Sequence, residues 1–301
     1  MPELPEVQTV IDGLIPFVKG STIKKLILNR KNLRFDFPKD FIKNLEGKKI
    51  DNISRRAKYL LFSISNDATL ISHLGMSGNF RILEKPLSND IIAIKHAHVI
   101  FSLIDKNQNP LTLIYTDARR FGFMDLSFDI ENNRFLEKLG VEPLGNQFNA
   151  QYLAQRFKGR KLPIKTALLD QSIIAGLGNI YVCEALWRAK IHPQTPIKDL
   201  MDKYGRPTNK LDVLSIAIVD ILNEAIKAGG STLKDFSNIS GEQGYFQHSF
   251  DVYGQEGRAC SRKTGNKKCS GNIQRISQSG RSSFFCPKCQ IMTNKPVDLM
   301  L

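Results

Sequence analysis

The sequence predicts an α+β fold with three parts: an N-terminal helix plus antiparallel β-sandwich, a helical domain, and a small zinc-binding segment at the C-terminus. Four observations predict it. Apolar residues recur at helical spacing in residues 5–18, and short β-branched segments follow one another between about residues 20 and 130. After residue 133 the helical spacing returns, and four of the five cysteines lie beyond residue 259.

The N-terminal segment predicts an amphipathic helix over residues 5–18. Its apolar positions lie at i, i+3, i+4 and i+7, on one helical face: Val7, Val10, Ile11 and Leu14. Pro5 suits the first turn, where its missing N–H costs no hydrogen bond, and Pro16 indicates where the helix weakens. We therefore expect a helix that begins near Pro5 and buries one face.

The next part of the chain predicts antiparallel strands. It contains the segments TIKKLILN, YLLFSISN, ATLISHLGM, HAHVIFSLID and LTLIYTD. Each is short, rich in β-branched or aromatic residues, and bounded by Asn, Asp or Gly, as strands commonly are. Several such strands in series favour a β-sandwich or a barrel.

Beyond residue 133 the pattern becomes helical. The segment IAGLGNIYVCEALWRA combines a glycine-rich turn with a helix, and TNKLDVLSIAIVDILNEAIKAGG carries an apolar face that ends at Gly229 and Gly230. The cysteine-bearing segment follows from about residue 251. We expect three domains, at residues 1–133, 134–250 and 251–291.

The composition points to a polyanionic partner. Lys and Arg total 43 against 29 Asp and Glu, a formal net charge of +14, and nucleic acid is the first candidate for such a surplus. The alternative is a basic surface without a specific partner. The 42% of hydrophobic residues suffice for a core, and an apolar run of about 18 residues, as a membrane span needs, is absent from the sequence. The start, MPELPEVQTV, does not look like a signal peptide, so we expect a soluble, cytoplasmic protein.

Four cysteines near the C-terminus predict a structural zinc site: Cys260, Cys269, Cys286 and Cys289. The segment Cys286-Pro-Lys-Cys289 lets one turn present two sulfurs to a tetrahedral Zn²⁺. The other pair is unusual, because the eight residues of 261–268 separate its cysteines, where about two to four are usual. Four cysteines without a metal are the alternative.

Positive charge surrounds these cysteines. Residues 257–289 contain no acidic residue and the following basic ones: Arg258, Arg262, Lys263, Lys267, Lys268, Arg275, Arg281 and Lys288. Part of this charge offsets the net negative zinc–thiolate centre, and the rest is available for phosphate. The turn Gly176-Leu-Gly-Asn179 opens a helix whose free N–H groups also suit phosphate, although a glycine-rich turn by itself is often merely a turn.

Pro2 is a candidate nucleophile if removal of Met1 exposes its secondary amine. An α-amino group has a pKa of ~8 against ~10.4 for lysine, so more of it is unprotonated at neutral pH and able to attack an electrophilic carbon. The iminium that forms keeps its positive charge and acts as an electron sink for elimination. Glu3 and Glu6 follow closely and suit general acid–base catalysis. Taken alone, two acids at a helix start are better explained by the helix dipole.

Three further segments carry candidate DNA contacts. Lys58 follows two arginines just ahead of a strand in RRAKYLL. Met76 lies at a glycine-flanked tip in HLGMSG, and DARRFG sets Arg119 close to Phe121, a plausible wedge into stacked bases. The simpler alternatives are a solvated basic turn, a methionine in the core, and an Arg–aromatic pair on the surface.

Taken together, these segments resemble the formamidopyrimidine-DNA glycosylase family. The resemblance is carried by MPELPEV, RRAKYLL, HLGMSG, KHAHV, DARRFG, GLGNIY, GYF and GRSSFFCPKCQ, in the family's order over essentially the whole chain. It implies a catalytic β-sandwich domain, a helix-two-turns-helix DNA-binding domain and a C-terminal zinc finger. It also implies that the loop near residues 230–248 closes over a base flipped out of the duplex.

The resemblance implies catalytic roles for five residues. Pro2 would form a Schiff base at C1′ of the damaged nucleoside, and Glu3 would be the general acid/base, supported by Glu6. Lys58 would act at phosphate and assist β-elimination. Arg281, in the finger's hairpin, would serve δ-elimination and bind phosphate.

The resemblance also implies DNA contacts. The gap left by the extruded base would be filled by Met76, Arg119 and Phe121, with Arg119 facing the estranged cytosine. The DNA backbone would be contacted by His96, Arg160 and Asn179.

The implied activity is that of a bifunctional glycosylase and AP lyase of base excision repair. It would excise 8-oxoguanine and formamidopyrimidines from double-stranded DNA, act on abasic sites, and cleave the strand by β,δ-elimination. The protein would be a monomer with one structural Zn²⁺, acting on bacterial DNA. Two alternatives remain: an enzyme of the same superfamily for oxidised pyrimidines, and a DNA-binding protein without catalysis. The RRF and HLGMSG segments favour the purine enzyme, and intact Pro2, Glu3 and Lys58 argue against the non-catalytic protein.

The finger departs from the family pattern in one place. The family reads Cys-x2-Cys-x16-Cys-x2-Cys; the last three cysteines match, but residues 261–268 make the first knuckle longer. Because loop length adds little closure entropy, we expect a bulged loop with zinc retained and Cys260 as the fourth ligand.

Overall fold

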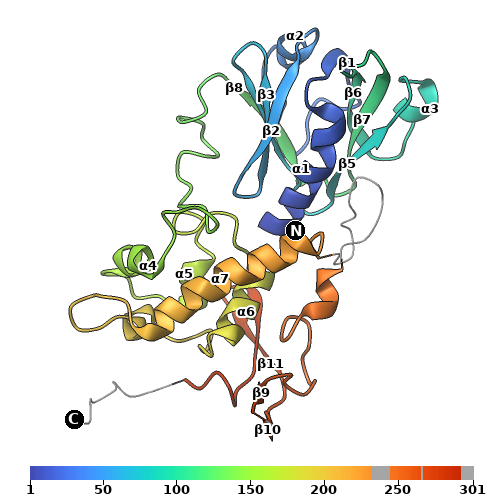
Figure 1. Cartoon of the computed structure of the whole chain (residues 1–301). Helices are drawn as coiled ribbons and strands as arrows, with labels where there is room; N and C mark the ends of the chain where they lie inside the picture. The colour runs from blue at the N-terminus through green and yellow to red at the C-terminus, as the bar shows by residue number, and fades with distance from the viewer. Residues whose placement is uncertain (232–244, 266, 293–301) are drawn as a thin grey trace. The chain divides into compact units, whose positions relative to one another are not determined.

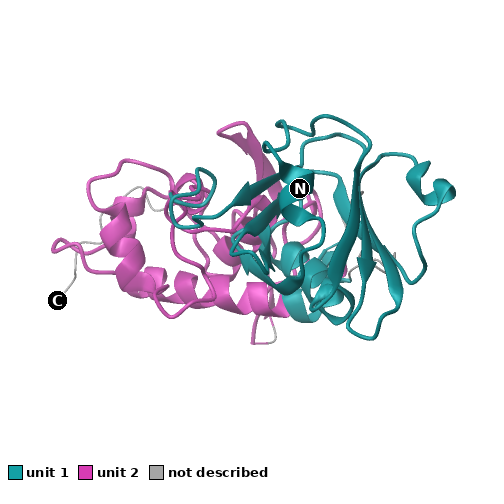
Figure 2. Cartoon of the chain, turned by 90° about the horizontal axis from the view of Figure 1, so that it is seen from above, with its two compact units in different colours: residues 1–137, 225–247 teal, residues 138–224, 248–301 magenta. Residues whose placement is uncertain are grey.

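The computed structural model describes residues 1–231, 245–265 and 267–292. They form two compact units (Figure 2). The first unit lies within Met1–Glu137 and Ala225–Gln247, and the second lies within Lys138–Glu224 and His248–Leu301. The first unit is mainly antiparallel β-structure, and the second combines helices with short hairpins. The predicted α+β class is confirmed.

Helix α1 spans Leu4–Val18 and matches the helix predicted for residues 5–18. Glu6 accepts a hydrogen bond from the backbone N–H of Glu3 at 2.8 Å, which satisfies one of the donors that a helix start leaves free. The predicted apolar face is buried. The helix continues for two residues past Pro16, because a proline this close to the C-terminal end disturbs little of the hydrogen-bond ladder.

Two four-stranded antiparallel sheets form the main part of the first unit (Figure 1). One has the order β1-β6-β7-β5, with strands at Thr22–Leu28, Ala97–Ile104, Pro110–Asp117 and Gly78–Leu83. The other has the order β2-β3-β4-β8, with strands at Ile50–Arg56, Tyr59–Ile64, Thr69–His73 and Phe123–Ser127. Two short helices occur between strands, α2 (Phe41–Leu45) and α3 (Asn89–Ile92).

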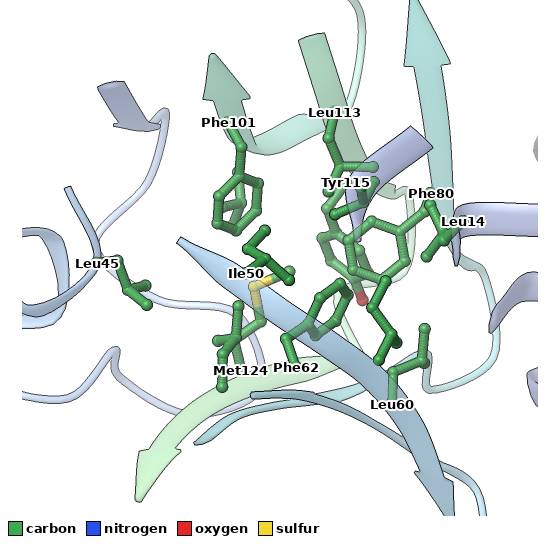
Figure 3. Packing of buried hydrophobic residues seen from close by; sticks show 14 of the residues in the cluster. Leu14, Leu45, Ile50, Leu60, Phe62, Phe80, Phe101, Leu113, Tyr115 and Met124 are labelled. Carbon is green, nitrogen blue, oxygen red and sulfur yellow. The ribbon is translucent and has the colours of Figure 1, made fainter. Parts of the chain in front are cut away.

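The core of the first unit is built from both sheets. Figure 3 shows Phe62 and Met124 from one sheet and Phe80, Phe101 and Tyr115 from the other, gathered in one cluster. None of the five is more than 2% exposed. Helix α1 contacts β2, β3 and β5 and buries its apolar face in the same cluster. The helix that carries the N-terminus is therefore fixed to the sandwich.

Helices dominate the second unit. They are α4 (Ala150–Phe157), α5 (Ile164–Leu168), α6 (Asn179–Arg188), the 3-10 turns η1 (Ile197–Leu200) and η2 (Phe246–Ser249), and α7 (Asn209–Lys227). The last residues of α7 and the first of η2 belong to the first unit. Asn149 begins α4 as an N-cap, because its side chain accepts the N–H of Tyr152 at 2.8 Å. Among the described residues, no helix is long and apolar enough to cross a membrane.

Two β-hairpins occur in the C-terminal part of the second unit (Figure 1). Strand β9 (Lys263–Thr264) pairs with β10 (Lys267–Lys268), and β11 (Gln274–Gln278) pairs with β12 (Arg281–Phe285). The second hairpin turns at Ser279 and Gly280, both with positive φ, as a tight two-residue turn requires.

The first hairpin consists of the residues that lengthen the first cysteine knuckle. The sequence predicted a bulged loop there, and the described residues instead pair as short strands, because pairing satisfies backbone groups that a loop would leave to water. The lesion-capping loop predicted near residues 230–248 falls mainly on residues 232–244, which lie outside the described residues.

Candidate functional site

The catalytic candidates of the first unit are buried. Pro2 directly precedes the two carboxylates that begin α1, and Glu3 and Glu6 are only 4% and 2% exposed. Lys58 is 6% exposed. A charged group is buried only where partners compensate its lost hydration, so each of these side chains is held by its surroundings. Met1, by contrast, is half exposed.

Glu6 connects the N-terminus to the chain that follows α7. One carboxylate oxygen, Oε2, accepts the N–H of Glu3 at 2.8 Å. The other, Oε1, accepts the N–H of Ser231 at 2.8 Å and its hydroxyl at 2.9 Å. Gly230 has φ of +76°, and a side chain there would approach the Glu6 carboxylate to 3.3 Å. Three hydrogen bonds to one buried carboxylate therefore fix the start of α1.

Lys58 lies in the tight turn between β2 and β3. Ala57 adopts a left-handed φ of 52° in this turn, and Arg56 pairs with Tyr59 across it. Arg55 donates a hydrogen bond to the carbonyl of Ala57 at 3.0 Å and holds the turn. The local structure therefore presents Lys58 at a defined place instead of leaving it on a solvated loop.

His73 ends strand β4 and is a buried residue, close to the charge of Lys58, that no sequence pattern singles out. Its burial, together with the positive charges of Lys58 and Arg34, lowers its pKa to about 4, so the imidazole is neutral at physiological pH. Nδ1 accepts the N–H of Gly75 at 3.0 Å, and the ring stacks on Phe123 with centroids 5.4 Å apart. The only available signal was its place in HLGMSG.

The wedge candidates lie at the surface of the first unit. Met76 is 37% exposed and Phe121 is 44% exposed, so Met76 is not a core residue. The guanidinium carbon of Arg119 lies 5.0 Å from the centroid of the Phe121 ring, within the range of a cation–π contact. Large exposed apolar side chains beside a cation suit insertion into a base stack.

Asp117 holds the loop that carries these residues. Its fully buried carboxylate accepts the hydroxyl of Ser77 at 2.5 Å and the N–H of Gly122 at 2.8 Å. The Ser77 oxygen accepts the N–H of Arg119 at 3.0 Å. A side chain on Gly122 would collide with the Tyr115 hydroxyl, which explains the glycine in DARRFG. The loops that contain Met76 and Phe121 are thus tied together through one buried carboxylate.

His96 is exposed just before β6 and has a left-handed φ of 63°. Its carbonyl accepts the N–H of Asp117 at 3.2 Å. This predicted backbone contact is therefore joined through the main chain to the wedge loop.

In the second unit, a buried lysine and a half-buried asparagine hold the strand that begins with Arg281. Lys165 is 1% exposed and donates to the carbonyl of Ser282 and the hydroxyl of Ser283, both at 2.7 Å. Asn179, the first residue of α6, donates to the same Ser282 carbonyl at 3.0 Å. Arg281 itself is exposed. The hairpin tip is thereby anchored while its arginine stays accessible.

The remaining predicted phosphate contact, Arg160, is half-exposed. It forms an ion pair with Asp170 at 3.2 Å. Asp170 also accepts the N–H and hydroxyl of Ser172 at 2.9 and 2.7 Å, so the carboxylate orients the arginine.

Glu184 joins α6 to the segment that leads into the finger. Its buried carboxylate accepts the backbone N–H groups of Asp251, Val252 and Tyr253 at 3.0, 3.0 and 2.8 Å. Burial outweighs these hydrogen bonds and raises the pKa of Glu184 to about 7. Neither Glu184 nor Lys165 had a sequence signal, because each contacts residues distant in the chain.

The four predicted cysteines come together in the second unit. One ligand atom from each of Cys260, Cys269, Cys286 and Cys289 lies within 4.8 Å of the others. The sulfur pairs 260–289, 269–286 and 269–289 are 3.8, 3.7 and 3.3 Å apart. Zn–S bonds of ~2.3 Å in a tetrahedron place sulfurs about 3.8 Å apart. These four thiols therefore fit one structural Zn²⁺.

Comparison with protein families assigns the same three parts. Residues 1–124 match the formamidopyrimidine-DNA glycosylase N-terminal domain, residues 139–237 the H2TH domain of the same glycosylase, and residues 267–291 the zinc finger found in FPG and IleRS. The zinc-finger match includes the last three cysteines and begins after Cys260. The fold and site thus define a DNA glycosylase with a zinc finger.

Individual proteins of this family are similar to nearly the whole chain. Formamidopyrimidine-DNA glycosylases from Allorhizobium ampelinum and Bartonella bacilliformis are each 48% identical, over 96% of this chain and all of the relative. A solved structure of a Lactococcus lactis FPG mutant in complex with Fapy-dG containing DNA has a TM-score of 0.81 and 37% identity, covering 96% of this chain and 100% of that one. The chain belongs to the formamidopyrimidine-DNA glycosylase family.

Proposed function

We propose that this protein excises oxidised purines, 8-oxoguanine and formamidopyrimidines, from DNA and then cleaves the strand at the abasic site. The observation that carries the proposal is the pair of buried carboxylates, Glu3 and Glu6, directly after Pro2 at a fixed helix start. The names of the relatives, and the Fapy-dG and abasic-site DNA in complexes of the Lactococcus lactis enzyme, support the substrate class. Acting on such DNA, the protein would work in the bacterial cytoplasm.

The reaction begins at the amine of Pro2 once Met1 has been removed. The nitrogen lone pair attacks C1′ and the damaged base departs with the bonding electrons. The proton that the Pro2 nitrogen gives up after the attack is transferred to the departing base, which leaves a neutral amine with its lone pair on C1′. Glu3 donates a proton to O4′ as the C1′–O4′ bond breaks, which leaves an iminium between Pro2 and C1′. Because this nitrogen carries no hydrogen, the iminium cannot be neutralised by deprotonation and remains an electron sink.

Strand cleavage follows from the iminium. Loss of a proton from C2′ sends electrons toward the iminium and expels the 3′ phosphate by β-elimination. Loss of a proton from C4′ then expels the 5′ phosphate by δ-elimination, and water releases the sugar product from Pro2. Lys58 assists the first elimination at phosphate and Arg281 serves the second, since a cation beside a departing phosphate stabilises its charge.

Glu6 is a positioning residue in this scheme. Its three hydrogen bonds hold Glu3 and the residues after α7, and a nucleophile at a chain end needs such support to stay in a productive geometry. We assign to Glu6 the orientation of Pro2 and Glu3.

Access to C1′ requires the damaged nucleoside to leave the base stack, which costs a few kcal/mol. Met76, Arg119 and Phe121 offset this cost by filling the vacated space, and their exposure on a loop held by Asp117 supports that role. Arg119 faces the estranged cytosine. His96, Arg160 and Asn179 add contacts to the DNA backbone.

The four cysteines would hold the structural Zn²⁺, which would supply a rigid base for the hairpin that carries Arg281. Within the second unit, Lys165 and Asn179 fix that hairpin at Ser282. The protein would act as a monomer on double-stranded DNA.

Borohydride trapping on 8-oxoguanine duplex DNA tests the proposal. A covalent protein–DNA adduct is expected, and it should be lost when residues remain ahead of Pro2 and strongly reduced in Pro2→Gly. Pro16→Ala, a proline change at an exposed position of the same helix, is the matched control and should trap normally. No adduct with any oxidised duplex would overturn the proposal and leave a DNA-binding protein.

A second substrate class has its own support. A Lactococcus lactis complex with oxidised-pyrimidine DNA matches this chain at 37% identity with a TM-score of 0.80. Parallel trapping on an oxidised-pyrimidine duplex compares the two classes. We expect faster adduct formation with 8-oxoguanine; the reverse order would assign the enzyme to pyrimidine lesions.

A further inference from the structure

The first knuckle of the zinc finger needs a structural explanation. Its eight-residue gap separates Cys260 from Cys269, and Cys260 lies outside the part matched by the zinc-finger family. A short knuckle positions two sulfurs through its own turn. A long one cannot do so by local geometry, and yet the Cys260 sulfur lies 3.8 Å from that of Cys289.

The first additional contact comes from α6. Trp187, in the last turn of that helix, donates its indole Nε1–H to the sulfur of Cys260 at 3.4 Å. Both side chains are buried, at 8% and 4% exposure. Trp187 is the single tryptophan of the chain, and an indole nitrogen can only donate. The donor therefore suits a sulfur that carries negative charge, as a zinc-bound thiolate does.

The second contact comes from the hairpin inside the gap. The guanidinium carbon of Arg262 lies 4.2 Å from the centroid of the Trp187 ring, a close cation–π contact. Its Nη2 donates to the carbonyl oxygen of Trp187. The carbonyl of Arg262 in turn accepts the N–H of Cys269 at 2.9 Å. One arginine thus connects the indole to the other end of the long knuckle.

We propose that Trp187 and Arg262 form the outer shell of the zinc centre and hold Cys260 in the fourth ligand position. Four thiolates around one Zn²⁺ carry a net charge of −2, so a hydrogen-bond donor on one sulfur and a guanidinium behind it stabilise the bound form. Arg262 acts through Trp187, which makes both residues positioning residues for the metal. The turn of a short knuckle is replaced by contacts to a helix.

Neighbouring contacts support this arrangement. Ser261 donates its hydroxyl to Asp251, and the N–H of Cys260 donates to the carbonyl of Gly271 at 2.8 Å. These two hydrogen bonds fix Cys260 and the residue after it in the chain. Two further cations of the hairpin, Lys263 and Lys268, are exposed and face each other across the strand pair. Neither lysine is among the cations that contact the Trp187 ring, so Arg262 differs from them by its contact and not by its charge.

Zinc affinity, measured on the full chain by competition with a metal chelator, tests the proposal. Outer-shell changes typically cost about 10–100-fold in metal affinity, so we expect this loss for Trp187→Phe and for Arg262→Gln. Two matched controls should stay within about twofold of the unaltered protein. Lys263→Gln removes a neighbouring charge, and Phe284→Leu removes aromatic packing from the same apolar cluster.

A second readout uses the indole itself. Removal of zinc should shift the fluorescence emission of Trp187, because the metal fixes the sulfur that accepts its N–H. Unaltered zinc affinity in Trp187→Phe, or losses in the two controls as large as in Arg262→Gln, would overturn the proposal. Since Arg262 is only half-buried on a surface hairpin, its variant tests the proposal even if Trp187→Phe fails to fold.

Discussion

The start of α1 and the tip of the finger hairpin differ in how they hold their charged groups. Glu3 and Glu6 are nearly without solvent exposure, whereas Arg281 is exposed at a tip that Lys165 and Asn179 support from beneath. Burial suits groups that exchange protons at fixed positions, because it isolates them from water. Exposure suits a group that meets phosphate, because the partner supplies the compensating charge. The two regions therefore suit the two proposed roles, the buried helix start for chemistry and the exposed hairpin tip for DNA binding.

The largest expected effect concerns Glu3. Glu3→Gln keeps the size of the side chain and removes its acid–base function, so the rate of 8-oxoguanine excision should fall by about 10²–10⁴-fold. DNA affinity should stay unchanged in a binding assay with an uncleavable duplex. Glu84→Gln, at an exposed position of the same unit, is the control and should retain full activity. If Glu3→Gln lost DNA affinity by as large a factor as it lost excision rate, the helix start would serve DNA binding as well, and the two regions would not differ in role.

The next effect concerns the pH dependence of stability in the first unit. The folded-state pKa of His73 lies at about 4, below the ordinary 6.5, so the unfolded chain binds more protons between these values. The stability that neutral His73 contributes is full above pH 6.5 and is lost as the pH falls toward 4. The lowering of the His73 pKa from 6.5 to about 4 corresponds to about 3 kcal/mol of unfolding free energy.

Denaturant unfolding of the unaltered protein and of His73→Gln at several pH values measures this effect. The difference between their unfolding free energies should change by up to about 3 kcal/mol across pH 4–6.5. Phe128→Leu, which changes an exposed side chain of the same unit without a titratable group, should show no such pH-dependent difference. If the difference in unfolding free energy between the two proteins were the same at every pH, burial would not be what keeps the imidazole neutral.

The smallest effect concerns the exposed region. Arg281→Gln should reduce the slope of log K for DNA binding against log salt by about 1, as expected for one lost phosphate contact. Arg206→Gln is the control, because Arg206 is paired with Asp202 at 2.8 Å, and its slope should not change. An unchanged slope in Arg281→Gln would remove that residue from the phosphate contacts.

Sequence patterns predicted the elements whose signal is local. The helix at residues 5–18 follows from its 3.6-residue spacing, and the strands from short β-branched segments between turns. The zinc ligands follow from four clustered cysteines. The gap hairpin was not predicted, because pairing two-residue strands depends on neighbouring contacts and leaves no periodic pattern.

The groups that were missed are buried polar residues with distant partners. Asp117 binds Ser77, Lys165 binds Ser282, and Glu184 binds residues 251–253. The contact of Glu6 with Ser231 spans most of the chain. A carboxylate or ammonium has no periodic signal, and only the folded chain shows what it touches.

Pro2 is the proposed nucleophile, and every later step of the reaction depends on it. The most direct test traps the enzyme on 8-oxoguanine duplex DNA with borohydride, digests the adduct, and locates the modified residue by mass spectrometry. We predict that the sugar remnant is on the N-terminal peptide, at the nitrogen of Pro2, with Met1 absent. A remnant on Lys58 or another lysine would contradict it.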